Sequence, residues 1–88
     1  MTSSFFSELF QTFDNINLEN INNDFTKWNG LSIQYFIIYL SLVKVDGNES
    51  RITKAKTIAQ NFINYPWHTQ VGNPEEAILK VQEFLNVS

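Results

Sequence analysis

The 88-residue chain offers few side chains that could do chemistry. His68 is the single histidine and cysteine is absent. The absence of cysteine excludes a thiol nucleophile and a zinc ribbon. A Ser-His-Asp triad would have to combine His68 with a serine and an acid that nothing in the sequence brings together. No glycine-rich phosphate-binding motif, G-x-S-x-G nucleophile elbow or H-E-x-x-H zinc motif occurs either. We expect no catalytic residue, no cofactor and no enzymatic activity.

One segment has oxygen-bearing side chains at spacings that suit a cation. Asp46, Asn48 and Ser50 alternate along the chain, as the ligands do in the first half of an EF-hand calcium loop. Such a loop needs glycine at its sixth position and a bidentate glutamate at its twelfth. This chain has Arg51 and Thr57 there, so we expect no metal site.

Residues 65–71 gather a tyrosine, a tryptophan and the histidine between two predicted helices. Connecting segments lie at the surface and often carry function, and Trp and Tyr are enriched at binding hot spots. Tyr65, Trp67 and His68 are therefore candidate partner-binding residues. In the alternative interpretation, Tyr65 and Trp67 fold back and close the end of a helical bundle.

A second aromatic cluster lies near the N-terminus. Large apolar residues recur there at helical steps of three and four, at Phe5, Phe6, Leu9, Phe10 and Phe13. A short helix with this many apolar side chains must dock, either on its own core or in the groove of a partner. Phe6 and Phe10 complete the set of candidate partner contacts.

The charge balance argues against a nucleic-acid-binding module. Six Lys and Arg residues face nine Asp and Glu residues, for a net charge of −3, whereas phosphate binding needs clustered bases. The most apolar run, residues 31–45, is shorter than the roughly 20 residues of a membrane span. The N-terminus lacks the basic start of a signal peptide. We expect a cytoplasmic protein that enters no membrane.

Apolar spacing and capping signals predict helices around residues 4–13, 17–28, 50–64 and 74–85. Asn17, Asn48 or Ser50, and Asn73 are candidate N-caps, with Pro74 in the first turn of the last helix. Asn29-Gly30 is expected to end the second helix. That helix is rich in asparagine and should be the least stable.

Residues 31–45 are apolar on nearly every side, so periodicity alone does not separate a buried helix from a strand. β-Branched and aromatic residues, followed by Asp46-Gly47, permit a hairpin. The run is nevertheless long for a strand, and a central helix explains it better. We predict an all-α, single-domain bundle of four to five helices over residues 1–88, with an α+β fold as the alternative.

The C-terminal quarter resembles the end of the colicin nuclease immunity proteins. The resemblance rests on Tyr65-Pro66, followed after seven residues by Pro74-Glu75 and a helix. Asn64 stands where that family has a further tyrosine, and the acidic second helix and short third helix of the family have no counterpart. The resemblance implies an acidic helical inhibitor that contacts a toxin through an aromatic segment.

These observations predict a small acidic, non-enzymatic protein–protein interaction module, either an adaptor or a complex subunit. The alternative is an immunity-type inhibitor that occludes a partner enzyme. A homo-oligomer that buries the surplus aromatic side chains is a further possibility.

Overall fold

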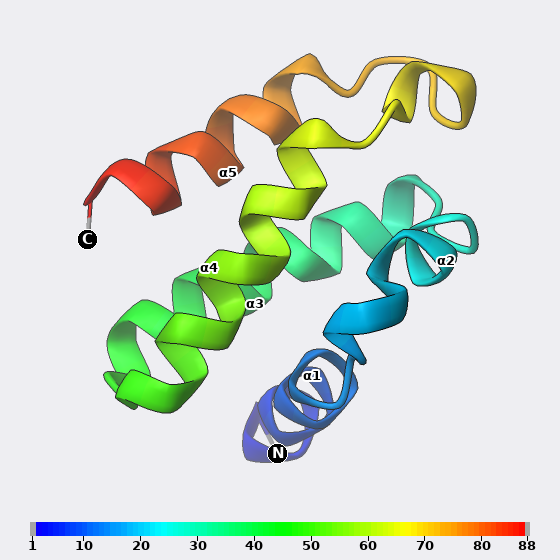
Figure 1. Ribbon diagram of the computed structural model, residues 1–88. Helices are drawn as coiled ribbons and strands as arrows, with labels where there is room; N and C mark the ends of the chain where they lie inside the picture. Colours follow the sequence, from blue (N-terminus) through cyan, green and yellow to red (C-terminus); the bar gives the residue numbers. More distant parts are fainter. Residues whose placement is uncertain (1, 88) are drawn as a thin grey trace.

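Helices account for most of residues 2–87, the part of the chain that the computed structural model describes; side chains are described for residues 4–86 (Figure 1). In chain order the elements are α1 (Thr2–Asp14), the 3-10 turn η1 (Leu18–Asn20), α2 (Ile21–Phe25), α3 (Gly30–Asp46), α4 (Glu49–Asn64), the 3-10 turn η2 (Trp67–Thr69) and α5 (Glu75–Val87). No strand occurs among residues 2–87. The all-α prediction is confirmed, and the hairpin around Asp46-Gly47 is wrong.

Helix α3 lies at the centre and packs against α1, α4 and α5. Its first turn is capped by Asn29, whose side-chain oxygen accepts a hydrogen bond of 3.0 Å from the amide of Ser32. Gly47 ends the helix in the left-handed region, at φ 74°, a conformation that glycine adopts without steric cost. Asn29 therefore caps the start of this helix, and the prediction that Asn29-Gly30 ends the preceding helix is wrong.

The predicted second helix is shorter than expected. Asn17 caps it as predicted, accepting a hydrogen bond from the amide of Glu19 at 3.0 Å. The segment then forms only η1 and the five-residue α2. Beyond Phe25 the chain continues in single turns, such as the bond from the Trp28 amide to the Phe25 carbonyl. The weak helix propensity of asparagine accounts for the short length, while Ile21 and Phe25 are held by burial.

Helices α4 and α5 form the other side of the bundle, and α4 crosses in front of α3 in Figure 1. Asn48 caps α4 by accepting from the amide of Arg51 at 3.0 Å, as predicted. Helix α5 begins at Glu75, so Pro74 precedes the helix instead of occupying its first turn. The carbonyl of Pro74 accepts the amide of Ile78 at 2.9 Å.

Aromatic rings fill the centre of the core. The largest fully buried side chains include Phe25, Phe36, Tyr39, Phe62 and Trp67. Neighbouring rings in this group lie 4.8–6.2 Å apart between centroids and mostly meet at tilted or edge-on angles, the geometry that aromatic pairs favour. This cluster joins α2, α3, α4 and η2.

Candidate interaction surface

Trp67, the most prominent predicted contact residue, lies inside the core. Its side chain is 0% exposed, and its indole Nε1 donates a hydrogen bond of 2.7 Å to the carbonyl of Phe62. The prediction that Trp67 contacts a partner is therefore wrong for this structure. The core accommodates the whole indole ring and provides an acceptor for its N–H group. Trp67 therefore closes the end of the bundle.

Tyr65 and Gln70 complete this closure. The hydroxyl of Tyr65 donates to Oε1 of Gln70 at 2.9 Å. Nε2 of Gln70 donates to the carbonyl of Phe25 at 2.6 Å and also to the carbonyl of Trp28. One side-chain amide thus supplies a donor to the carbonyl of Trp28 and a second donor to the carbonyl of Phe25, which also accepts the amide of Trp28. Sequence reasoning missed Gln70, because a lone glutamine in a connecting segment has no pattern that marks it.

His68 is exposed at the outer side of η2. Its Nε2 lies 3.7 Å from a carboxylate oxygen of Glu75, and both side chains are largely in solvent. An exposed pair of this kind contributes little to stability. Of the three candidates in residues 65–71, only His68 presents its side chain freely to a partner.

The two N-terminal candidates differ in their surroundings. Phe10 is half-buried, with its ring 6.0 Å from Tyr39 and the guanidinium carbon of Arg51 4.0 Å from its centroid. Phe6 is exposed and lies 6.0 Å from Phe5, which is exposed as well. Phe10 therefore lies where α1 meets α3 and α4, and Phe6 remains available at the surface.

Arg51 is the centre of a polar network that joins α1 to α4. Its Nε donates to Asp14 at 2.8 Å and its Nη1 to Asp46 at 2.8 Å. The hydrogen bond to Asp14 is the main reason why the pKa of Arg51 is raised. Asp14 also accepts the hydroxyl of Tyr39 at 2.7 Å. The Asp46 carboxylate, the first oxygen donor of the calcium-like segment, is thus engaged by a cation of the chain itself.

Acidic and histidine side chains do not gather elsewhere in the described part of the chain: no group of three or more His, Cys, Asp or Glu residues that could hold a metal ion is found there. The cleft between α1 and α3 is lined mostly by apolar side chains and hydroxyls, whereas other clefts have more charged side chains in their walls.

The outer face of α3 carries a continuous apolar row. Its members follow one another at steps of four, three, four and three, at Leu31, Tyr35, Ile38, Leu42 and Val45, and we call them the α3 stripe. All except the half-buried Leu42 are exposed; Leu31 is 60% and Val45 87% exposed. The opposite face of the same helix supplies Ile33, Phe36, Leu40 and Val43 to the core. Helix α3 is therefore apolar on both its buried and its exposed side.

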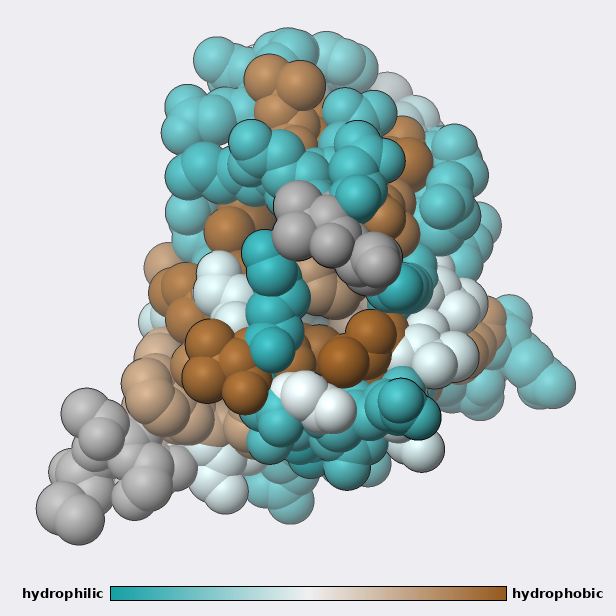
Figure 2. All heavy atoms as spheres, turned by 90° about the vertical axis from the view of Figure 1, so that its left-hand side faces the viewer, coloured by the Kyte–Doolittle hydropathy of each residue, from teal (hydrophilic) through white to brown (hydrophobic). Residues whose placement is uncertain are grey.

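Phe5 and Phe6 extend this surface from α1. The ring of Phe5 lies 6.0 Å from that of Tyr35, edge-on. We call Phe5, Phe6, Leu31, Tyr35 and Ile38 the α1–α3 face. Figure 2 shows brown apolar atoms at several places between the teal polar atoms on the side of the molecule that it draws.

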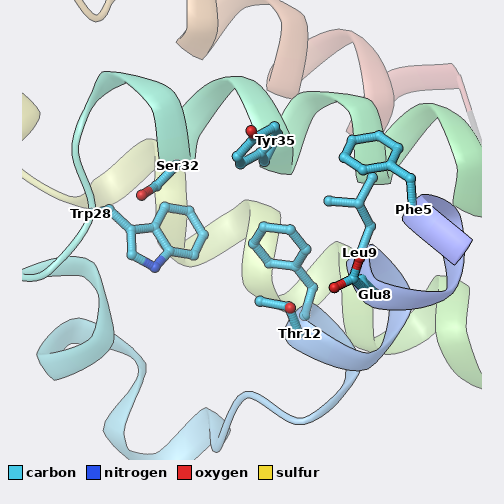
Figure 3. Close-up of a pocket in the computed structure, with 8 residues that line it drawn as sticks. Phe5, Glu8, Leu9, Thr12, Trp28, Ser32 and Tyr35 are labelled. Atoms are coloured by element: carbon cyan, nitrogen blue, oxygen red, sulfur yellow. The ribbon is translucent and has the colours of Figure 1, made fainter.

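A groove of about 400 Å³ adjoins this face between α1 and α3 (Figure 3). The rings of Phe5, Trp28 and Tyr35 line it together with Leu9. Glu8 and Ser32 are among its polar lining residues. Phe5 and Tyr35 thus belong to both the groove and the α1–α3 face. A side chain that enters the groove would contact mainly aromatic rings and aliphatic carbon atoms.

Comparison with protein-family models, curated proteins and solved structures finds no match for this chain. The resemblance of its C-terminal quarter to the immunity proteins is therefore a local one. None of the helices described here is both long and apolar enough to cross a bilayer.

Proposed function

We propose that this chain is a small, non-enzymatic protein–protein interaction module, and that the α1–α3 face is where it binds. The observation that carries this proposal is the exposed apolar row on α3, a helix whose opposite side already supplies the core. A helix that only completes the core of a bundle needs a single apolar stripe. Only Leu42 of the second stripe packs against the core, and Leu31 and Val45 remain largely in solvent.

The size of this surface supports binding rather than chance exposure. A large side chain exposes about 200 Å² when free, so the exposed fractions of the α1–α3 face and of Val45 correspond to roughly 600 Å². The largest apolar patch on an ordinary monomer spans about 300–600 Å² and is often functional. Burying the face against another protein would remove this area from water, which favours binding.

The composition of the face indicates the kind of contact. Phe5, Phe6 and Tyr35 are aromatic, as binding hot spots often are. Charged residues are absent from the face itself, and Glu8 stands in the adjoining groove. We expect the partner to present an apolar helix or loop, with one side chain seated in the groove and polar groups around it.

A comparison of variants tests the proposal. The double variant Leu31→Ser, Ile38→Ser removes two exposed apolar side chains from α3, and Leu79→Ser removes one that is 61% exposed on α5. Proteins captured from an extract of the source cells are compared for the wild type and both variants. A captured protein is then purified and titrated against all three chains.

We expect the wild type and Leu79→Ser to bind the purified partner equally. The double variant should bind about 30-fold more weakly, the effect of losing a hot spot worth roughly 2 kcal/mol. Equal binding by all three chains would show that the α1–α3 face is not the binding surface. If the partner is an enzyme, its activity in the presence of one equivalent of the chain separates an occluding inhibitor from an adaptor.

A further inference from the structure

The α3 stripe has a symmetry that a general docking surface does not need. Leu31 and Val45 each lie seven residues from Ile38, while Tyr35 precedes it by three and Leu42 follows it by four. Alternating steps of three and four are the seam of a helix that packs along another helix. The stripe spans about 20 Å at 1.5 Å per residue. The spacing of apolar residues along the stripe is therefore nearly the same in both chain directions.

We propose that the occupant of this surface is a second copy of the chain, with the two α3 helices packed antiparallel about a twofold axis at Ile38. This inference rests on the proposed function, because it names the partner of the same surface. In this arrangement Ile38 meets Ile38 of the other copy. Tyr35 then lies beside Leu42 of the other copy, and Leu31 beside Val45. Every apolar residue of the stripe finds an apolar neighbour.

The charges on α3 permit two copies to approach. Lys44 and Asp46 are the only charged residues in its 17-residue length, and neither belongs to the stripe. Asp46 is already paired with Arg51. Gln34 and Ser41, which are exposed on the same side of the helix, are neutral. Antiparallel packing also brings opposite ends of the helix dipoles together, whereas parallel packing aligns like ends.

The area available is that of a small but specific dimer. The exposed apolar surface of the stripe with Phe5 and Phe6 amounts to roughly 600 Å² per copy, or about 1,200 Å² over both. Stable interfaces bury about 1,200–2,000 Å² in total. The dimer therefore lies at the lower end of that range, and we expect it to dissociate in the micromolar range.

Cysteine cross-linking tests the geometry directly, because the chain has no cysteine of its own. Under mild oxidation Ile38→Cys should form a disulfide-linked dimer, since the twofold axis brings the two residues 38 within reach. Leu31→Cys and Val45→Cys should each stay monomeric alone but cross-link when mixed. Leu79→Cys, exposed on α5, gives the background level of random collision.

Sedimentation equilibrium tests the association without any cross-link. The wild type and Leu79→Glu should be dimeric at about 100 µM, and Ile38→Glu should be monomeric with an unchanged helical circular dichroism spectrum. A wild type that stays monomeric at this concentration, with Ile38→Cys no more cross-linked than Leu79→Cys, would overturn the second copy as occupant. Self-cross-linking of Leu31→Cys and Val45→Cys as well as Ile38→Cys would overturn the antiparallel arrangement.

The experiments distinguish a failure of the self-association proposal from a failure of the proposed function. A monomeric chain that still captures another protein, and loses it in the Leu31→Ser, Ile38→Ser variant, keeps the interaction surface and refutes self-association. A monomeric chain that captures nothing through this face refutes both.

Discussion

The indole Nε1 of Trp67 donates a 2.7 Å hydrogen bond to the carbonyl of Phe62, in the last turn of α4. A tryptophan can be fully buried only where its N–H finds an acceptor. The end of α4 provides one, because the last carbonyls of a helix have no partner within it. The bond therefore explains how a residue from a connecting segment becomes the largest side chain of the core.

The substitution Trp67→Ala should lower the free energy of unfolding by about 3–5 kcal/mol, through the cavity that it leaves among Phe25, Phe62 and Tyr65. Urea denaturation followed by circular dichroism measures this loss. The matched control is His68→Ala at the neighbouring exposed position, which should change stability by less than about 0.5 kcal/mol. Equal, small effects at the two positions would contradict the buried placement of Trp67.

Gln70→Ala should lower the free energy of unfolding by about 1–3 kcal/mol. The substitution removes the side-chain donor to the carbonyl of Trp28 and one of the two donors to the carbonyl of Phe25, and a part-buried carbonyl without a partner is costly. Gln82→Ala, at an exposed position of α5, is the matched control and should be nearly neutral. Thermal or urea unfolding of both variants checks the difference; a neutral Gln70→Ala would mean that water replaces the amide without cost.

Stability should fall above about pH 10 because of Tyr39. Burial raises the pKa of Tyr39 well above its ordinary value of 10.0, and its hydrogen bond to Asp14 adds to this shift. Above pH 10 the unfolded chain loses the phenolic proton while the folded chain keeps it. Folding is therefore disfavoured by up to about 1.4 kcal/mol for each further pH unit, and the contribution is fully present only below pH 10.

Urea titrations between pH 8 and 11.5 test this dependence in the wild type and in Tyr39→Phe. The phenylalanine variant lacks the titrating group, so its stability should fall less steeply over the same range. Parallel curves for the two proteins would show that another group causes the alkaline loss.

Gly47→Ala should cost about 1–2 kcal/mol, although a Cβ at this position meets no atom within 4 Å. The cost comes from φ at +74°, where a side chain is strained. Gly72→Ala is the control, since it has equal space and no positive φ. It should be neutral or slightly stabilising, because alanine restricts the unfolded chain. Thermal unfolding should rank the wild type between the two variants or level with Gly72→Ala.

Much of the fold could be predicted from local patterns. The apolar spacing in α1, α4 and α5 and the caps at Asn17 and Asn48 depend on residues close in sequence. The predicted second helix is longer than the observed one. Its apolar spacing extends to Trp28, but its asparagines disfavour a helix of that length. The assignment of Asn29 failed because one residue can end a helix or begin the next, and only the backbone decides.

The candidate surface was predicted less well. Phe6 is exposed as a contact residue must be, whereas Trp67 and Phe10 turn inward. Aromatic residues serve cores and interfaces alike, so their type does not say which way they face. The residues of the α3 stripe are spaced at alternating steps of four and three within residues 31–45. Because the residues between them are apolar as well, this spacing does not stand out in the sequence.

The sequence by itself determined that the chain is helical, where most helices begin and end, and that no motif of known chemistry is present. Only the tertiary structure decided which side of α3 is buried and that the segment from Tyr65 to Val71 closes the bundle. Periodicity identifies a buried side by contrast with a polar one. A helix that is apolar all round offers no such contrast. Which of its faces is buried therefore depends on where the other helices pack against it.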